Sequence, residues 1–404
     1  MNDTVYEKIK SLSDELEAQT LSLRRCIHNN PELSFHEKET SALVQRELKR
    51  IGIPFELSPV EPGVIGMIDS GKPGKLLLLR ADMDALPITE DTGLPFSSKN
   101  NGVMHACGHD VHTSNLLAVA EILWRLRGEW KGRVKLVFQP GEENGGGGRQ
   151  MIEKGLMDEL PDACFALHVQ PERPGFFQIG TGPVTAWSDG FWIDIHGKAA
   201  HSSTPQLGVD AINIAAAIIQ ELNTVLARNV SPMTASAMNI GTIKGGYAPN
   251  VIPDYVELNG MMRNETKEAR EIIFRRIEEI AKRTAEAMGG SADVRFRIGY
   301  SSVVNDAKLA SFAEDLFRKE EHQLFSGITE NGAAPAGWLR TGKQFTLAGE
   351  DFGFYTQKAP SCFIWIGTGD GASNHNPKFT VEEPYIKLCT RAMADFAVAF
   401  LSES

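Results

Sequence analysis

The segment Met104–His112 (MHACGHDVH) gathers Cys107, His109, Asp110 and His112 within six residues. A helix is predicted to follow at 113–127, so these side chains lie near a helix N-terminus. The positive end of a helix lowers the pKa of a thiol and favours the thiolate. Thiolate sulfur and imidazole nitrogen together suit Zn²⁺ or a similar transition metal. The segment alone also fits a buried cysteine beside polar residues that cap a helix.

Two adjacent carboxylates, Glu142 and Glu143, follow a predicted buried strand at 134–138, within QPGEE (139–143). Folds of the α/β class place ligand sites at the carboxyl ends of their strands. One carboxylate can bind a metal while its neighbour deprotonates the attacking water. The alternative for this segment alone is a solvated acidic turn. Gly145–Gly148 lacks the Gly-Lys-Ser/Thr ending of a phosphate-binding loop, so we expect a tight turn there.

Four further side chains extend the pattern. Asp82 and Asp84 follow a predicted strand at 75–79, and their spacing points both carboxylates the same way in an extended chain. Each can bind a metal or orient a histidine that does. His168 ends the apolar run CFALHV, and His375 lies in SNHNP (373–377). All these residues fall at strand ends or in loops of one domain, as an open metal hydrolase site requires.

The elements that must position these residues are of two kinds. Strands at 75–79 and 134–138 alternate with helices at 36–51 and 113–127, which predicts an α/β domain with a largely parallel sheet. The middle of the chain instead shows the order β-α-β-β-α-β of a ferredoxin-like unit. Its predicted elements are 191–196, 209–228, 235–243, 255–263, 267–288 and 293–298. The α/β pattern resumes with a helix at 307–319 and a strand at 362–366.

The length of 404 residues agrees with two or three domains. We expect a smaller domain, 188–301, inserted into a larger one formed by 1–187 and 302–404. The net charge of −11 argues against nucleic-acid binding and against anionic membrane surfaces. No signal peptide or membrane-spanning run is expected. The five cysteines are odd in number and widely spread, so a cytoplasmic protein without a disulfide framework is predicted.

The chain resembles the M20 family of metallopeptidases, in the branch of hippurate hydrolases, N-acyl-amino-acid deacylases and auxin-conjugate hydrolases. The motifs that carry the resemblance run in family order along the chain: PELSFHEKET (31–40), RADMDALP (80–87), HACGHDVH (105–112), QPGEE (139–143), LHV (167–169), GKAAHSSTP (197–205), NVIPD (250–254), GEDF (349–352) and HNP (375–377). The resemblance implies a metal-binding α/β catalytic domain with an inserted ferredoxin-like lid and dimerisation domain.

The resemblance also implies two divalent metal ions per subunit, which would be Zn, Mn, Co or Ni. The implied ligands are Cys107, His109, Glu143, His168 and His375. Asp82 and Asp84 fall where the family has support for the metal site. Glu142 would be the general base that acts on the attacking water.

Three further roles are implied for the inserted domain. His201 would stabilise the developing oxyanion, in its own or the partner subunit's site. Asn250 and Arg263 match positions that contact substrate. A homodimer, possibly a tetramer, would form through this domain. After His201 many relatives carry glycine and a bulkier residue, whereas this chain has Ser202–Thr204, which puts substrate specificity in question.

The implied reaction is hydrolysis of the amide bond of N-acetyl or aromatic N-acyl amino acids, which releases a carboxylic acid and an amino acid. A dipeptidase or aminopeptidase on the same scaffold is the first alternative, and it would need an acidic site for a free amine. A cysteine hydrolase, with Cys107 as nucleophile and His109 or His168 as base, is the second. The third is a binding module that has lost activity, although no proposed ligand is missing.

Overall fold

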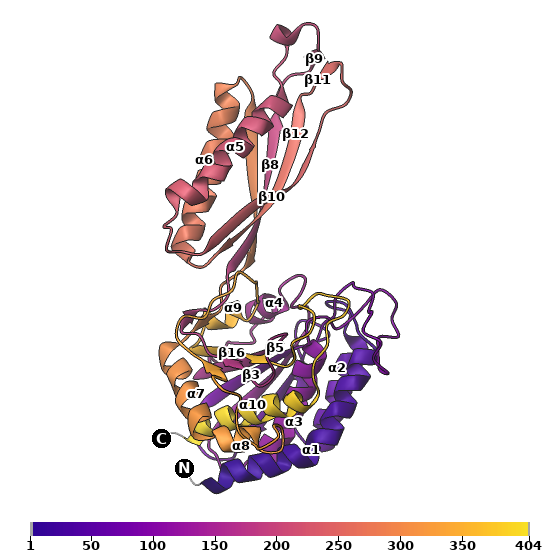
Figure 1. Ribbon diagram of the computed structural model, residues 1–404, viewed down its shortest axis with the longest axis vertical. Helices are drawn as coiled ribbons and strands as arrows, with labels where there is room; N and C mark the ends of the chain where they lie inside the picture. The colour runs from indigo at the N-terminus through magenta and orange to yellow at the C-terminus, as the bar shows by residue number, and fades with distance from the viewer. Residues whose placement is uncertain (1–2, 403–404) are drawn as a thin grey trace. The chain divides into compact units, whose positions relative to one another are not determined.

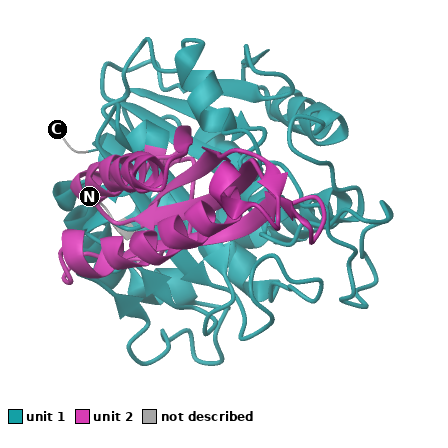
Figure 2. Cartoon of the chain, turned by 90° about the horizontal axis from the view of Figure 1, so that it is seen from above, with its two compact units in different colours: residues 1–184, 303–344, 354–404 teal, residues 185–302, 345–353 magenta. Residues whose placement is uncertain are grey.

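The computed structural model describes residues 3–402, and these form two compact units (Figures 1 and 2). Unit 1 contains the described residues up to 184 together with 303–344 and those from 354 onward, and unit 2 contains 185–302 and 345–353. The sequence pattern predicts 345–353 as part of the larger domain. The segment instead clusters with unit 2, where the carbonyl of Ala348 accepts the N–H of Ala186 at 2.9 Å.

Unit 1 is built on an eight-stranded sheet with the order β1-β2-β4-β3-β5-β16-β6-β15. Its strands are β1 (Phe55–Leu57), β2 (Val64–Asp69), β3 (Leu76–Asp82), β4 (Arg133–Gln139), β5 (Ala163–Gln170), β16 (Ser361–Gly367), β6 (Phe177–Gln178) and β15 (Leu339–Arg340). The four central strands β4, β3, β5 and β16 run parallel. Strand β2 pairs antiparallel with β1 and β4, while β6 is antiparallel to β16 and parallel to β15. Every residue of β3 is buried, which explains its continuous apolar run.

Helices cover one face of this sheet in a row. Helices α2 (Lys38–Ile51), α3 (His109–Arg125), α10 (Pro384–Ser402) and α7 (Ala307–Lys319) lie next to one another, and α1 (Asp3–Asn29) packs across α3 and α10 (Figure 1). Helix α3 begins at His109 rather than at 113, so His109 and His112 lie in its first turn. Gly108 precedes it with a φ of 93°, and a Cβ there would meet Val169 Cγ2 at 2.3 Å.

Unit 2 has the predicted ferredoxin-like order. Strands β10 (Ser236–Gly245), β12 (Tyr255–Asn264), β8 (Trp187–His196) and β13 (Ser291–Tyr300) form an antiparallel sheet in that order. Helices α5 (Ala211–Asn229) and α6 (Lys267–Ala287) pack on one face of it (Figure 1). Side chains of Asp210 and Thr266 cap their N-termini by accepting backbone N–H groups.

The shorter elements complete the chain. They are α4 (Gly147–Glu153), β7 (Gly182–Pro183), β9 (Ala200–His201), η1 (Pro205–Leu207), β11 (Val251–Ile252), β14 (Val304–Asn305), α8 (Glu321–Phe325) and α9 (Gly353–Thr356). Strands β9 and β11 pair as a separate antiparallel ribbon in unit 2, and β7 pairs with β14 in unit 1. Within residues 3–402, no helix is both long enough and apolar enough to cross a membrane.

Candidate metal centre

The carboxyl ends of three neighbouring strands bring the candidate residues together in unit 1. Asp82 ends β3, Glu142 and Glu143 follow β4, and His168 lies near the end of β5. Because β4, β3 and β5 are parallel neighbours, these ends meet at one edge of the sheet. The start of α3 adds a cysteine and a histidine, and the loop after β16 adds another histidine.

Cysteine, histidine and carboxylate atoms converge in this region in overlapping groups. In each group the candidate ligand atoms lie within 4.8 Å of one another. The groups are Cys107–His109–His168, Cys107–Glu143–His375, His109–Glu142–Glu143 and Asp82–His109–His112. The structure therefore gathers the five ligands predicted from the sequence, together with the predicted base Glu142.

The Asp84 side chain accepts hydrogen bonds from the backbone of the loop that bears Glu142 and Glu143. Its Oδ1 accepts the N–H of Glu142 at 3.1 Å, and its Oδ2 accepts the N–H of Glu143 at 2.9 Å. His109 donates from Nδ1 to the carbonyl oxygen of Asp84 at 2.9 Å, with Oδ1 at 3.2 Å. Burial would raise the pKa of Asp84, but the bond from His109 outweighs it and the pKa is lowered. Asp84 is thus an ionised support that orients both the carboxylate loop and His109.

Asp82 supports the cluster from its other side. Its Oδ2 accepts a bond from Arg80 at 2.6 Å, and its Oδ1 accepts one from His112 Nδ1 at 2.6 Å. His112 Nε2 in turn accepts the N–H of Val169 at 3.0 Å. Burial opposes ionisation, yet the charges of Arg80, His109 and His112 lower the pKa of Asp82 well below its usual value. Since both nitrogens of His112 have protein partners, this histidine orients Asp82 and is not available to a metal.

The arrangement of two imidazole rings fits a metal ion. His109 uses Nδ1 for Asp84, and its buried Nε2 has no hydrogen-bond partner among the described residues. That Nε2 lies 3.8 Å from Asp82 Oδ2 and 3.9 Å from Glu143 Oε1. His168 donates from Nδ1 to the Val169 carbonyl at 2.6 Å, and its Nε2 lies 3.5 Å from Cys107 Sγ. Imidazole nitrogens, one of them without a hydrogen-bond partner in the described part of the chain, together with sulfur and carboxylate oxygen form a donor set typical of a transition-metal site.

His375 lies on the solvent-exposed side of the cluster. Its N–H donates to the carbonyl of Ala106 at 2.8 Å, and its φ of 63° lies in the left-handed region. Its Nε2 lies 3.2 Å from Glu143 Oε1, and this contact raises the pKa of His375. The His375 side chain is 53% exposed, so the cluster is open to solvent on this side.

The thiol of Cys107 differs from the sequence expectation. A helix N-terminus should lower its pKa, but burial and the charge of Glu143 raise the pKa of Cys107 well above its usual value. Burial of the sulfur is the larger of these two causes. A neutral thiol is a poor nucleophile, whereas a bound cation would favour its ionisation.

The raised pKa of His109 also indicates a site that favours a cation. Burial alone would lower the pKa of His109, but Asp82 and Asp84 outweigh it and raise this pKa well above its usual value. The space around His109 Nε2 thus has an excess of negative charge, which favours a cation.

The three residues predicted for the inserted domain all lie in unit 2. His201 on β9 is exposed, and its Nδ1 accepts the N–H of Ser203 at 3.1 Å with Ser203 Oγ at 2.7 Å. Asn250 adjoins it, because its carbonyl accepts the N–H of Ser202 at 3.0 Å. Arg263 lies instead on β12, in register with Ser188, and burial lowers its pKa. Within unit 2, His201 and Asn250 are neighbours and Arg263 belongs to a different sheet.

The cluster also depends on α1, which sequence reasoning missed. Arg24 Nε donates to Asp110 Oδ2 at 2.7 Å, and His28 Nδ1 donates to the same oxygen at 2.8 Å. His28 Nε2 lies 3.2 Å from Glu90 Oε1. These buried bonds fix the first turn of α3, next to His109. No local sequence pattern predicts these hydrogen bonds, because the bonded residues are 86 and 82 positions apart.

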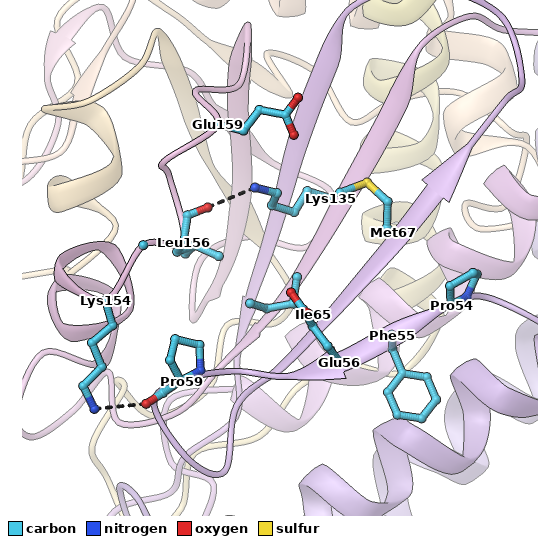
Figure 3. A pocket seen from close by; sticks show the side chains of 11 residues that line it. Pro54, Phe55, Glu56, Pro59, Ile65, Met67, Lys135, Lys154, Leu156 and Glu159 are labelled. Atoms are coloured by element: carbon cyan, nitrogen blue, oxygen red, sulfur yellow. Dashed lines mark hydrogen bonds between the residues drawn. The ribbon is translucent and has the colours of Figure 1, made fainter.

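A separate pocket of about 560 Å³ lies elsewhere in unit 1 (Figure 3). Ile65 and Met67 of β2 and Lys135 of β4 line it, and Lys135 Nζ donates to the Leu156 carbonyl at 3.0 Å. Burial lowers the pKa of Lys135. No residue of the metal-ligand groups lines this pocket, so we place the chemistry at the cluster and not here.

An α/β domain with sulfur, imidazole and carboxylate donors at its strand ends, joined to a ferredoxin-like domain, has the architecture of a metal-dependent hydrolase. Comparison with known families agrees. A statistical model of peptidase family M20/M25/M40 matches residues 78–399, and the chain belongs to this family of hydrolases.

Three similar proteins illustrate the range of the family. The chain is 37% identical to an N-acetyl-L-cysteine deacetylase of Bacillus subtilis over 92% of this chain and 85% of that protein. It is 35% identical to thermostable carboxypeptidase 1 of Saccharolobus solfataricus over 98% and 99%. The solved structure of the Bacillus subtilis YXEP protein, a dinuclear metal binding peptidase from the M20 family, matches with a TM-score of 0.82 and 32% identity, covering 96% of this chain and 99% of that one.

The buried His28 predicts a pH dependence of stability. Burial would lower its pKa, but Asp110 and Glu90 outweigh burial and raise it to about 8. With an unfolded pKa of about 6.5, protonated His28 stabilises the fold fully below about pH 6.5, and this contribution is lost as the pH rises through about 8. We expect the contribution of His28 to the free energy of unfolding to fall by about 2 kcal/mol between these limits.

Urea unfolding of the wild type and of His28→Gln from pH 6 to pH 9 checks this. The fall should be smaller in the variant by about the His28 contribution, while His36→Gln, a substitution at an exposed histidine, should keep the full wild-type fall. Equal pH dependence in the wild type and His28→Gln would contradict the assignment.

Proposed function

We propose that the chain hydrolyses the amide bond of N-acetyl or aromatic N-acyl amino acids, releasing a carboxylic acid and a free amino acid. The observation that carries the proposal is the position of Glu142, a buried carboxylate within 4.8 Å of ligand atoms of His109 and Glu143. Such a carboxylate can take a proton from water beside a metal. The name of the deacetylase relative supports the class of substrate.

The proposed ligands of two divalent ions are Cys107, His109, Glu143, His168 and His375. The ions are Zn, Mn, Co or Ni, because the set mixes one sulfur with nitrogen and carboxylate oxygen. When bound, divalent ions supply Lewis-acid polarisation of the amide carbonyl and lower the pKa of water. Asp84 orients His109 and fixes the backbone of Glu142 and Glu143, while the charge of Asp82 lies 3.8 Å from His109 Nε2.

Glu142 is the proposed general base and then the general acid. It removes a proton from the attacking water, whose oxygen adds to the carbonyl carbon. The carbon–nitrogen bond then breaks, and Glu142 returns the proton to the leaving amine. The two N–H bonds at Asp84 restrict the loop that bears this carboxylate, which keeps it in place for both transfers.

His201 is the proposed donor to the developing oxyanion, in its own or the partner subunit's site. Its Nδ1 accepts the N–H of Ser203, so the ring proton of the neutral form belongs on Nε2. Nε2–H is then the group that can donate to a negative oxygen. Asn250, which adjoins His201, and Arg263 are the proposed contacts to the substrate.

The carboxypeptidase relative favours a second candidate reaction. A carboxypeptidase and an N-acyl-amino-acid hydrolase both cleave an amide whose leaving amine bears a free carboxylate. The two candidates therefore differ in the acyl side alone, which is a peptide in one case and a simple acyl group in the other. Dipeptidase or aminopeptidase activity is a further alternative.

Cysteine nucleophile chemistry is less favoured by the geometry. Cys107 Sγ and His168 Nε2 are 3.5 Å apart, which is the spacing of a nucleophile and its base. However, burial raises the pKa of Cys107 and lowers the pKa of His168 well below its usual value. Both shifts oppose the thiolate–imidazolium pair that such an enzyme needs.

A homodimer through unit 2, and possibly a tetramer, is part of the proposal. Strand β10 is an edge of the unit 2 sheet, and residues 242–245 at its end are all exposed. An exposed edge strand is suited to pairing with a second chain. A cytoplasmic location is also proposed, and the five free cysteines agree with a reducing compartment.

Glu142→Gln tests the proposed base. The amide keeps the size of the carboxylate but cannot accept a proton, so we expect turnover of an N-acetyl amino acid to fall by about 10²–10⁴-fold or more. Bound metal per chain, measured by elemental analysis, should stay at the wild-type value. Glu153→Gln, on the exposed surface of α4, is the control and should leave turnover unchanged. Retained activity in Glu142→Gln would exclude the proposed role.

Chelation combined with a substrate panel tests the reaction class. Dialysis against a chelator should abolish hydrolysis, and Zn²⁺, Mn²⁺, Co²⁺ or Ni²⁺ should restore it. N-acetyl and N-benzoyl amino acids should be cleaved much faster than dipeptides with a free amine, while rapid cleavage of acyl peptides would favour the carboxypeptidase candidate. Activity that resists the chelator but is lost on thiol alkylation would point to the cysteine mechanism instead.

A further inference from the structure

The segment 32–37 supplies none of the proposed ligands, yet its side chains contact Asp84 and the loop that bears Glu142 and Glu143. Ser34 Oγ donates to Asp84 Oδ2 at 2.6 Å. Glu37 Oε1 accepts the N–H of Gly141 at 2.8 Å, immediately before Glu142 and Glu143. One short segment therefore contacts both the carboxylate that supports the cluster and the loop that carries its base.

Phe35 fills the inner side of that loop. A Cβ at Gly141 would lie 2.5 Å from Phe35 Cζ, and one at Gly145 would lie 2.7 Å from Phe35 Cε2. The ring therefore occupies the space that two side chains would need, and the glycines allow the loop to wrap around it. Phe35 itself has a φ of 64°, a strained backbone conformation that is unusual for a bulky residue. Such a conformation persists only where its surroundings impose it.

Glu37 is a carboxyl group buried beneath the same loop. It is 0% exposed, and its Oε2 has no hydrogen-bond partner among the described residues. Burial and the charge of Asp84 raise the pKa of Glu37 to about 8. A buried group that is only half satisfied lowers the stability of a fold, so its presence at this position calls for another explanation.

The segment is itself fixed through its first residue, Glu32. The carbonyl of Glu32 accepts the N–H of Ala85 at 2.8 Å, next to Asp84. The carboxylate of Glu32 accepts the N–H groups of Glu39 and Thr40 at 3.0 and 2.9 Å, at the start of α2. The segment is thus anchored to the end of β3 on one side and to α2 on the other.

We propose that three side chains of the 32–37 segment position the carboxylate loop: Ser34 orients Asp84, Phe35 sets the curvature of residues 141–145, and Glu37 fixes the backbone of Gly141. These are positioning residues, since none of them reaches the reacting atoms. The proposal rests on the proposed function for the identity of Glu142 and Glu143 as base and ligand. Groups that orient ligands in this way change metal affinity or activity by about 10–100-fold when they are removed.

The test compares Glu37→Ala, which removes the acceptor for Gly141, with Glu37→Gln, which keeps an oxygen at that position. The exposed neighbour His36→Ala is the matched control. Each chelator-treated protein is titrated with Co²⁺ by visible absorption, and kcat and KM are measured on the metal-loaded proteins.

We expect Glu37→Ala to bind Co²⁺ about 10–100-fold more weakly and to lose kcat with little change in KM. Glu37→Gln should return the Co²⁺ affinity and kcat toward their wild-type values. His36→Ala should have the wild-type Co²⁺ affinity and the wild-type kcat. A folded Glu37→Ala with wild-type Co²⁺ affinity and wild-type kcat, even if less stable, would overturn the proposal.

If Glu37→Ala does not fold, Ser34→Ala and Phe35→Leu decide the question by the same two measurements, and wild-type values in both would overturn the proposal. Failure of the proposed function is distinguishable. A wild-type protein that binds Co²⁺ but cleaves no N-acyl amino acid would contradict the reaction, while the Co²⁺ affinities of the variants would still test the segment.

Discussion

The site depends on one buried carboxylate, that of Asp84, and on the four groups that bond to it. The backbone N–H groups of Glu142 and Glu143, the ring of His109 and the hydroxyl of Ser34 all donate to it at 2.6 to 3.2 Å. A buried carboxylate is costly unless its oxygens are satisfied, so these bonds have to form together. In this way the end of β3 fixes the loop after β4 and the start of α3.

The sequence could predict those helices and strands whose own residues show a clear hydrophobic pattern. The apolar run of β3 indicated a strand buried on both faces, and the β-α-β-β-α-β pattern indicated the ferredoxin-like unit. Contacts between distant segments gave no such signal. The bonds of Arg24 and His28 to Asp110 depend on α1, and the bond of Glu37 to Gly141 joins residues 104 positions apart. The pKa of Cys107 could not be predicted either, because it depends on burial and on Glu143, whose position only the fold defines.

The two units differ in the burial of their proposed site residues. In unit 1 the supports of the cluster are fully buried and bonded on both sides, as Asp82 and Asp84 show, which suits a site that must hold charged ligands in fixed geometry. In unit 2, the side chains of His201 and Asn250 are exposed. Because the pKa of His109 is raised, a metal cation must displace a proton from this ring in the apoprotein. Metal affinity should therefore fall with decreasing pH.

The most direct test of the account is anomalous X-ray diffraction from metal-loaded crystals at the absorption edge of the bound metal. The account predicts two anomalous peaks per chain, both within bonding distance of the set Cys107, His109, Glu143, His168 and His375. His109 should coordinate through Nε2 and retain its Nδ1 bond to Asp84. No peak at this cluster, or peaks bonded to a different set of side chains, would contradict it.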